Sequence, residues 1–168
     1  MRNKQKGFSL IELLIVVAII LIIAAIAIPN LIRSKMAANE ASAVATLRSI
    51  NTAQVVYSST YNVPFTFAAA LTDLADGGVA TSCVQGAAPP TSTNACLLDA
   101  AVAAATAVAF AKSGYRLGYT PPTATTGYAV TNSPVTPGSS GTRYFYTDPS
   151  LVIRKSSTTT ATGTDSPI

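Results

Sequence analysis

Hydrophobic residues dominate the start of the chain. Phe8 to Ile28 is an apolar run of 21 residues, and Glu12 is the only charged residue in it. A helix of that length spans about 30 Å at about 1.5 Å per residue, so it can cross a bilayer once. Because an ionisable side chain at membrane depth is costly unless it is paired, Glu12 is a candidate functional residue.

Beyond Asn30 the apolar residues become periodic. They recur at steps of three, four and seven residues, and the charged residues of the segment fall elsewhere. The apolar set is Ile32, Met36, Ala43, Leu47, Ile50, Tyr57 and Tyr61, and the charged set is Arg33, Lys35, Glu40 and Arg48. This pattern predicts an amphipathic helix whose apolar stripe packs on its own globular domain. Joined to the apolar run, it predicts a helix of about fifty residues, near 75 Å long if it is continuous.

The second half of the chain reads as a short helix followed by strands. Leu97 to Lys112 is alanine-rich and free of proline, which predicts a helix that ends at Gly114. Four short segments rich in β-branched and aromatic residues follow, separated by Pro, Gly and Ser: residues 114–120, 126–135, 142–148 and 151–155. We interpret them as antiparallel strands, so the predicted fold class is α+β. Residues 156–168, eight of them Ser or Thr, are expected to form a mobile tail.

Few residues in the chain are candidates for a chemical role. Cys83 and Cys96 could be a redox pair or half a metal site, but CxxC spacing and histidine are both absent, which favours a structural disulfide. In Tyr144-Phe145-Tyr146, alternate residues of a strand face opposite sides, which predicts one core aromatic with surface tyrosines beside it.

Charge and composition argue against several function classes. The net charge is +4, but three of the eleven positive residues lie in the first seven, and without them the balance is 8 minus 7, or +1. No basic cluster with interleaved aromatics remains, so specific nucleic-acid binding is not expected. The chain has no His, scattered acids and no phosphate-binding glycine loop, so we expect neither an enzyme nor a cofactor. Asp73 and Asp76 fit a helix end and turn better than a metal site, and no metal is expected.

The residues alone leave the role of the N-terminal segment open. Arg2, Lys4 and Lys6 precede the apolar run, which keeps the first residues cytoplasmic and exports everything after about Asn30. A plain anchor, a signal peptide cleaved after Ala25-Ile26-Ala27, and a segment that uses Glu12 all fit this pattern.

A family resemblance separates these readings. The stretch KGFSLIEL, residues 6–13, follows a short basic leader and resembles the signal of type IV prepilins and pseudopilins. The resemblance implies cleavage after Gly7 by a prepilin peptidase, methylation of the new amine on Phe8, and retention of the apolar segment. It also implies that Glu12 pairs with the Phe8 amine of a neighbouring subunit, and that Pro29 kinks or opens the helix.

The resemblance also implies a layout. Residues 1–7 would be the leader, 8–30 the transmembrane and assembly helix, 31–60 its amphipathic second half, 61–155 the pilin-like globular domain, and 156–168 the tail. The long helix would pack on the C-terminal antiparallel sheet.

The function implied is that of a structural subunit of a type IV pilus-like filament, acting in adhesion, motility or DNA uptake. One alternative is the major pseudopilin of a type II secretion system. Such pseudopilins commonly bind calcium through C-terminal acids, of which only Asp148 and Asp165 occur here, and this favours the pilus. A monomeric membrane-anchored binding protein is the other alternative.

Partners and location follow from the same resemblance. The expected partners are other copies of the chain in a helical homopolymer, the prepilin peptidase and methyltransferase, the inner-membrane assembly machinery, and the lipid bilayer. The precursor would cross the inner membrane once, and the product would be an extracellular surface filament or a periplasmic pseudopilus.

Overall fold

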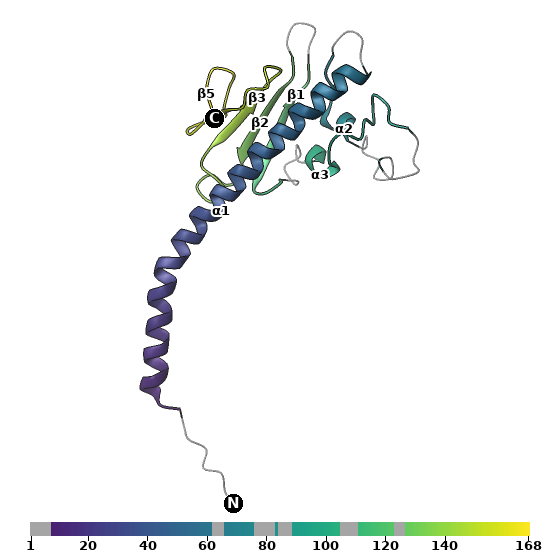
Figure 1. Ribbon diagram of the computed structural model, residues 1–168. Coiled ribbons are helices and arrows are strands. Elements are labelled where there is room, and N and C mark those ends of the chain that lie inside the picture. The colour runs from purple at the N-terminus through teal and green to yellow at the C-terminus, as the bar shows by residue number, and fades with distance from the viewer. Residues whose placement is uncertain (1–7, 62–65, 76–82, 84–88, 105–110, 123–126) are drawn as a thin grey trace, which may run out of the picture. The chain divides into compact units, whose positions relative to one another are not determined.

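The computed structural model describes residues 8–61, 66–75, 83, 89–104, 111–122 and 127–168 (Figure 1). It divides the chain into two compact units, Met1–Lys35 and Met36–Ile168. Its helices are α1 (Leu10–Tyr61), α2 (Leu71–Leu74) and α3 (Ala100–Ala103). Its strands are β1 (Tyr115–Thr120), β2 (Ala129–Pro134), β3 (Tyr144–Thr147), β4 (Arg154–Ser156) and β5 (Ser166–Pro167).

The described strands form one antiparallel sheet in chain order, β1-β2-β3-β4-β5. Such a meander needs only short connections between neighbours, which the turn-rich sequence supplies. Burial alternates along the strands, as in β2, where Val130 and Asn132 are buried and Thr131 between them is less so. One face of the sheet therefore turns inward.

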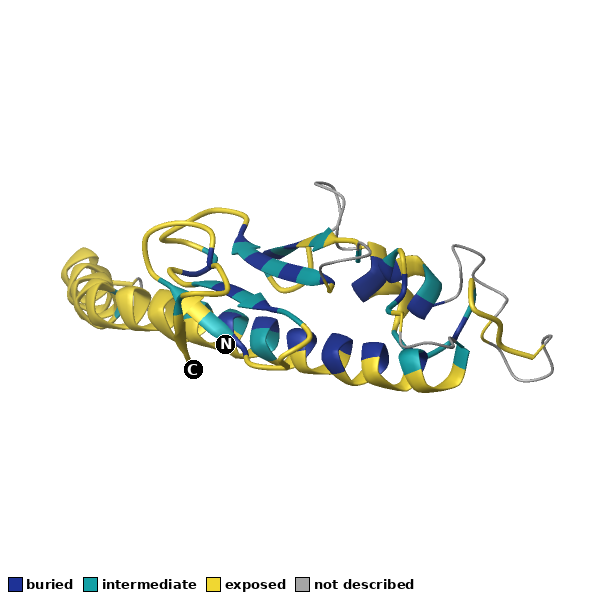
Figure 2. Cartoon of the chain, turned by 90° about the horizontal axis from the view of Figure 1, so that it is seen from above, coloured by how far each residue is buried: buried dark blue, intermediate teal, exposed yellow. Residues whose placement is uncertain are grey.

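The second half of α1 covers that inward face. Figure 2 shows its buried residues as one dark stripe on the side turned toward the strands. Leu47 and Ile50 of α1 are fully buried in one cluster with Leu117, Val130 and Phe145 of the sheet. Burying each such side chain contributes about 1.5–3 kcal/mol to stability. The predicted α+β architecture, a long N-terminal helix packed on a C-terminal antiparallel sheet, is confirmed.

Parts of the predicted strand pattern are wrong at the C-terminus. The strand expected over residues 151–155 begins at Arg154, because Leu151 has a left-handed φ of 64° that no strand residue adopts. The expected mobile tail carries β5, which pairs with β4. Ala161 within it is buried, and the N–H of Ile168 donates to the carbonyl of Ile153 at 3.0 Å. The end of the chain thus adds an edge strand.

The helix predicted over Leu97 to Lys112 is also placed differently. It starts at Ala100, because the Asp99 carboxylate accepts the Ala101 N–H at 2.7 Å and caps the first turn. Lys112 is not helical, since its backbone exchanges two hydrogen bonds of 3.0 Å with that of Tyr115. Residues 105–110 lie outside the described part of the chain.

Candidate assembly site

The first part of α1 exposes its apolar side chains on all sides. Within the described residues, α1 is the helix long and apolar enough to cross a membrane, with a mean hydropathy of 3.3 and no buried residue in its most apolar window. Its large apolar side chains from Leu10 to Ile28 are Leu, Ile and Val. A surface of this kind requires a bilayer or an apolar protein partner to cover it.

Glu12 lies in the first turn of this helix, and Phe8 just precedes it. The Ser9 carbonyl accepts the N–H groups of Glu12 and Leu13 at 3.1 and 3.2 Å, which starts the helix directly after Ser9. The Glu12 carboxylate therefore lies at the positive end of the helix dipole, where a negative charge is stabilised. Gly7, the residue before the expected cleavage point, lies outside the described residues.

The spacing of Ser9 and Glu12 carries a signal that the sequence analysis missed. A serine followed three residues later by glutamate is the pattern of a capping box, which favours a helix start at this place. Both residues are exposed. Because Glu12 is exposed, its carboxylate is accessible to groups from outside the chain. Pro29 lies further along, and α1 continues through it.

The second unit contains a buried charge that the sequence analysis placed wrongly. Glu40 was assigned outside the apolar stripe of α1, yet it is only 5% exposed. It lies three residues before Ala43 and seven before Leu47, so its position belongs to the stripe although its side chain is polar. The spacing of Glu40 from Ala43 and Leu47 is the sequence signal that places Glu40 on the buried face of α1.

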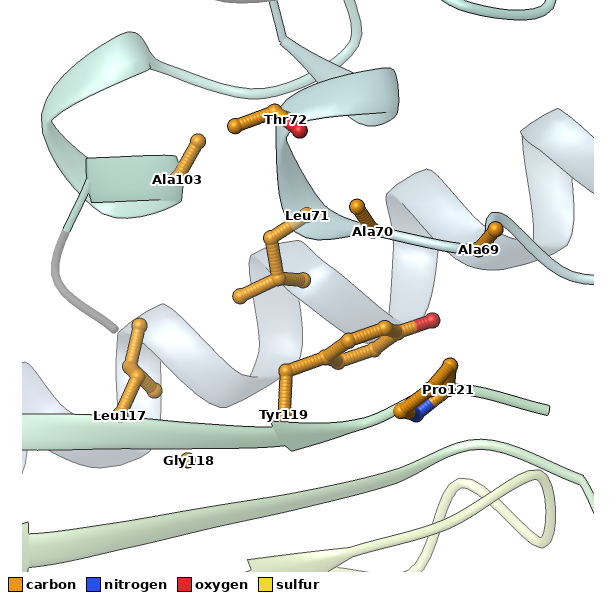
Figure 3. Close-up of a pocket in the computed structure, with 9 residues that line it drawn as sticks. All are labelled: Ala69, Ala70, Leu71, Thr72, Ala103, Leu117, Gly118, Tyr119 and Pro121. Carbon is orange, nitrogen blue, oxygen red and sulfur yellow. The ribbon is translucent and has the colours of Figure 1, made fainter. Parts of the chain in front are cut away.

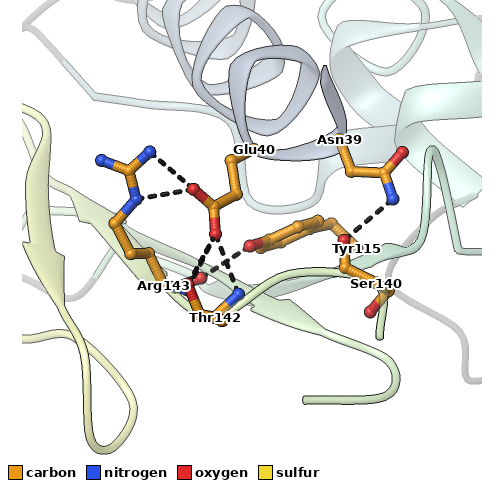
Figure 4. A network of polar contacts seen from close by, with 6 residues as sticks. All are labelled: Asn39, Glu40, Tyr115, Ser140, Thr142 and Arg143. Atoms are coloured by element: carbon orange, nitrogen blue, oxygen red, sulfur yellow. Dashed lines mark hydrogen bonds and ion pairs between the residues drawn. The ribbon is translucent and has the colours of Figure 1, made fainter. Parts of the chain in front are cut away.

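The Glu40 carboxylate holds the segment before β3 (Figure 4). It accepts hydrogen bonds from the Thr142 N–H at 2.8 Å, the Arg143 N–H at 3.2 Å and the Arg143 Nε at 2.6 Å. Burial alone would raise the pKa of Glu40, but these hydrogen bonds and the Arg143 charge outweigh it and lower the pKa below the usual 4.5. Glu40 is therefore ionised at neutral pH.

Two further polar residues of the stripe fasten α1 to the domain. Asn51 Nδ2 donates to Thr147 Oγ1 at 2.8 Å, and Tyr128 OH donates to Asn51 Oδ1 at 3.1 Å. Gln54 Nε2 donates to Tyr119 OH at 2.8 Å. Because these side chains are paired, their burial fixes the orientation of the helix on the sheet at little cost.

The Gln54 contact extends into the segment before α2. Gln54 Oε1 accepts the Ala68 N–H at 3.0 Å, and Tyr119 OH donates to the Ala68 carbonyl. Burial raises the pKa of Tyr119 to about 12, so its hydroxyl stays a neutral donor. This segment also lines a groove of about 450 Å³ between α2, α3 and β1, into which Leu71, Leu117 and Tyr119 project (Figure 3).

The two cysteines are joined to each other. Cys83 and Cys96 form a disulfide with Cα atoms 5.5 Å apart. Backbone hydrogen bonds tie the segment after Asn94 to α2, with Leu97 N–H donating to the Leu74 carbonyl at 2.7 Å and Leu98 N–H to the same carbonyl at 2.9 Å. Both cysteines thus lie beside the end of α2, where the Cys96 N–H donates to the Ala75 carbonyl at 2.9 Å.

Acidic and aromatic candidates have ordinary structural roles where the structure describes them. The described residues contain no cluster of three or more potential metal ligands. Asp73 Oδ2 accepts the Ala70 N–H at 3.0 Å at the start of α2, and Asp76 lies outside the described residues. Phe145 is buried between half-buried Tyr144 and Tyr146, which confirms the predicted strand alternation.

Comparison with known proteins connects this geometry to a family. Residues 2–28 match the model of the prokaryotic N-terminal methylation motif. The chain is 51% identical over 51 residues to the type IV major pilin protein PilA of Myxococcus xanthus, which covers 30% of this chain and 23% of that protein. It is 51% identical over 57 residues to the type IV wide pilus major component PilA4 of Thermus thermophilus, covering 34% of this chain and 43% of that protein.

These similarities cover about a third of this chain and less than half the length of either relative. No solved structure matches the chain. Both relatives are structural components of pili. The methylation motif and the two relatives show that about a third of this chain is similar to type IV pilins.

Proposed function

We propose that this chain is the structural subunit of a type IV pilus-like filament and polymerises through its N-terminal apolar helix. The observation that carries the proposal is the exposed Leu, Ile and Val surface of residues 10–28, with one carboxylate in its first turn. In the precursor a bilayer covers this surface. Outside the bilayer, the same helices of neighbouring copies cover this surface, because they carry the same apolar side chains.

Processing creates the charge that Glu12 requires. In the precursor, the Phe8 nitrogen is part of a peptide bond and carries no charge. Cleavage after Gly7 by a prepilin peptidase turns it into an amine, which remains cationic after methylation. A carboxylate in an apolar environment is strongly penalised unless it is paired, so Glu12 favours neighbours whose Phe8 amine reaches it. Cleavage thereby converts a subunit that is held in the membrane into one that can assemble.

The remaining segments take their roles from this scheme. Residues 1–7 are the leader, 8–30 the assembly helix with Pro29 near its end, and 31–60 the link to the globular domain at 61–155. The precursor spans the inner membrane once, and the assembly machinery moves the processed subunit into a surface filament. Such a filament serves adhesion, motility or DNA uptake, as the resemblance implies.

The experiment combines shearing with mass measurement in the native cells. We expect shear-released filaments made mainly of a chain that begins with N-methyl-phenylalanine at Phe8. A filament that stays periplasmic would instead indicate a secretion pseudopilus. An uncut chain that remains in the membrane fraction would indicate a monomeric anchored protein and contradict the proposal.

A further inference from the structure

Two basic side chains follow the apolar run of α1 on its exported side. Arg33 and Lys35 lie five and seven residues after Ile28, where the apolar run ends, and both are exposed. Positive residues are disfavoured on the exported flank of a membrane helix, because they oppose the orientation that a basic leader sets. Their presence at this place therefore indicates a role that outweighs this cost.

The chain supplies no acidic partner for these two residues. Between Glu12 and Glu40, Arg33 and Lys35 are the only charged residues. The Glu40 carboxylate is already bound by Arg143, whose Nε donates to it at 2.6 Å. Within the described residues neither Arg33 nor Lys35 forms an ion pair. Both charges are therefore uncompensated in the part of the chain that the structure describes.

The position of Arg33 and Lys35 along the helix matches the headgroup layer of a bilayer. With residues 8–28 in the hydrocarbon core, which is about 30 Å thick, the headgroup region extends about 5–7 Å beyond Ile28. At about 1.5 Å per residue, the Arg33 backbone lies about 7.5 Å beyond Ile28 and the Lys35 backbone about 10 Å. In a helix the Cα–Cβ bonds tilt toward the N-terminus, so both long side chains point back toward the membrane. Their charged ends therefore reach the level of the lipid phosphates.

The two side chains leave the helix in nearly opposite directions. Successive residues of a helix are rotated by about 100°, so Arg33 and Lys35 lie about 200° apart and do not face each other. A protein packed on one face of the helix would contact one of them and leave the other in water. A lipid surface surrounds the helix and meets both. The arrangement therefore favours a lipid surface over a docked protein as the anionic partner.

We propose that Arg33 and Lys35 bind the phosphate headgroups of anionic phospholipids on the exported side of the membrane and enrich these lipids around α1. The inference rests on the membrane-spanning precursor in the proposed function and adds a lipid partner to it. Cleavage after Gly7 removes the three basic residues of the leader. Arg33 and Lys35 are then the basic side chains next to the bilayer, and they hold the processed subunit at a fixed depth until it enters a filament.

Fluorescence quenching in lipid vesicles tests the proposal. The chain has no Trp, so Leu31→Trp, at an exposed position two residues before Arg33, introduces a single reporter. The membrane-extracted chain is reconstituted in vesicles of phosphatidylcholine and phosphatidylglycerol, with one of the two lipids at a time carrying brominated acyl chains that quench Trp on contact. We expect the reporter to be in contact with phosphatidylglycerol in preference to phosphatidylcholine, by a factor of about five for each basic residue.

Variants of the two basic residues show whether their charges cause this preference. Arg33→Gln combined with Lys35→Gln should abolish it, and Arg33→Lys should retain it because the charge is kept. Arg48→Gln is the matched control, since Arg48 is another exposed arginine of α1 that lies 15 residues after Arg33, in the second unit. The control should leave the preference unchanged.

Equal quenching by the two lipids, or an undiminished preference in the double variant, would overturn the inference. The vesicles contain no other protein, so a chain whose partner is an acidic protein would give equal quenching. Loss of the preference when inorganic phosphate replaces chloride at the same ionic strength would assign the two charges to a soluble anion and also overturn the inference. None of these measurements depends on cleavage or assembly. Absence of shear-released filaments would therefore overturn the proposed function and leave this inference standing.

Discussion

Glu40 of α1 and Arg143 before β3, 103 residues apart in the chain, form an ion pair in which Arg143 Nε donates to Glu40 Oε2 at 2.6 Å. Glu40 lies four residues after Met36, where the globular unit begins. The pair therefore joins the first turns of α1 within this unit to the start of β3, the central strand of the sheet. Because the Glu40 carboxylate is buried and the Arg143 side chain is partly exposed, the two partners are not equivalent.

Arg143→Gln should destabilise the domain more than Glu40→Gln. The first change leaves a buried carboxylate without its cation, whereas the second leaves a partly exposed guanidinium that water can solvate. We expect losses of about 2–3 and about 1–2 kcal/mol. Denaturant unfolding of the full chain in detergent micelles measures both. The double variant should lose less than the sum of the two, and strict additivity would show that the pair is not coupled.

The same pair predicts an acid dependence of stability. The pKa of Glu40 is lower in the folded chain than its usual 4.5, so the unfolded chain takes up the proton first as the pH falls. The contribution is fully present above pH 4.5 and is lost as the pH falls through the folded pKa. Unfolding free energies of the wild type and Glu40→Gln between neutral pH and pH 3 should converge on acidification. Parallel curves would contradict the assignment.

Tyr119→Phe should cost about 1–2 kcal/mol, because it removes the hydroxyl that joins Gln54 to the Ala68 carbonyl and leaves buried polar groups unpaired. Tyr144→Phe is the control, since Tyr144 is only half-buried. Thermal unfolding of both variants compares the losses. Ultraviolet titration should also show that Tyr119→Phe removes a tyrosine that ionises near pH 12. An equal loss in the two variants would argue against the Gln54 contact.

Replacing Cys83 and Cys96 together by Ser should lower stability by about 3 kcal/mol in the chain-entropy model, because the disulfide closes a short loop. Denaturant unfolding under non-reducing conditions measures the loss against the wild type. A non-reducing digest of sheared material should contain one peptide pair bridging the two residues. Recovery of both as free thiols would contradict the prediction.

Glu12→Leu should be inserted and cleaved normally but should not enter filaments. Insertion favours an apolar residue, and cleavage depends on the Gly7–Phe8 junction, whereas assembly requires a carboxylate for the neighbour's amine. Shear-released filaments are quantified beside processed membrane-bound subunit in cells with only the variant copy. Normal filament yield from this variant would falsify the pairing role.

Local patterns in the sequence determined the features that depend on neighbouring residues. The apolar run of residues 8–28 is long enough for a membrane helix by composition alone, and α1 begins within it. The strand centres follow from alternation between turn residues, as at Phe145. Cys83 and Cys96 had only each other as partners in a chain with two cysteines. Each of these features rests on a period, a length or a count that is visible in one stretch of chain.

Tertiary structure alone decided the features whose partners are distant. Glu40 has a polar side chain at a position on the apolar stripe. Its burial is favourable only because Thr142 and Arg143 donate hydrogen bonds to its carboxylate. The Ser/Thr-rich end has a composition typical of a mobile tail, yet it forms β5 because β4 presents a free edge for pairing. Leu151 leaves the strand pattern in a turn closed by the nearby Asp148 carbonyl, and Asn51, 100 residues away in the chain, approaches the Leu151 carbonyl at 3.5 Å. In each case at least one of the contacting groups lies far away in the sequence.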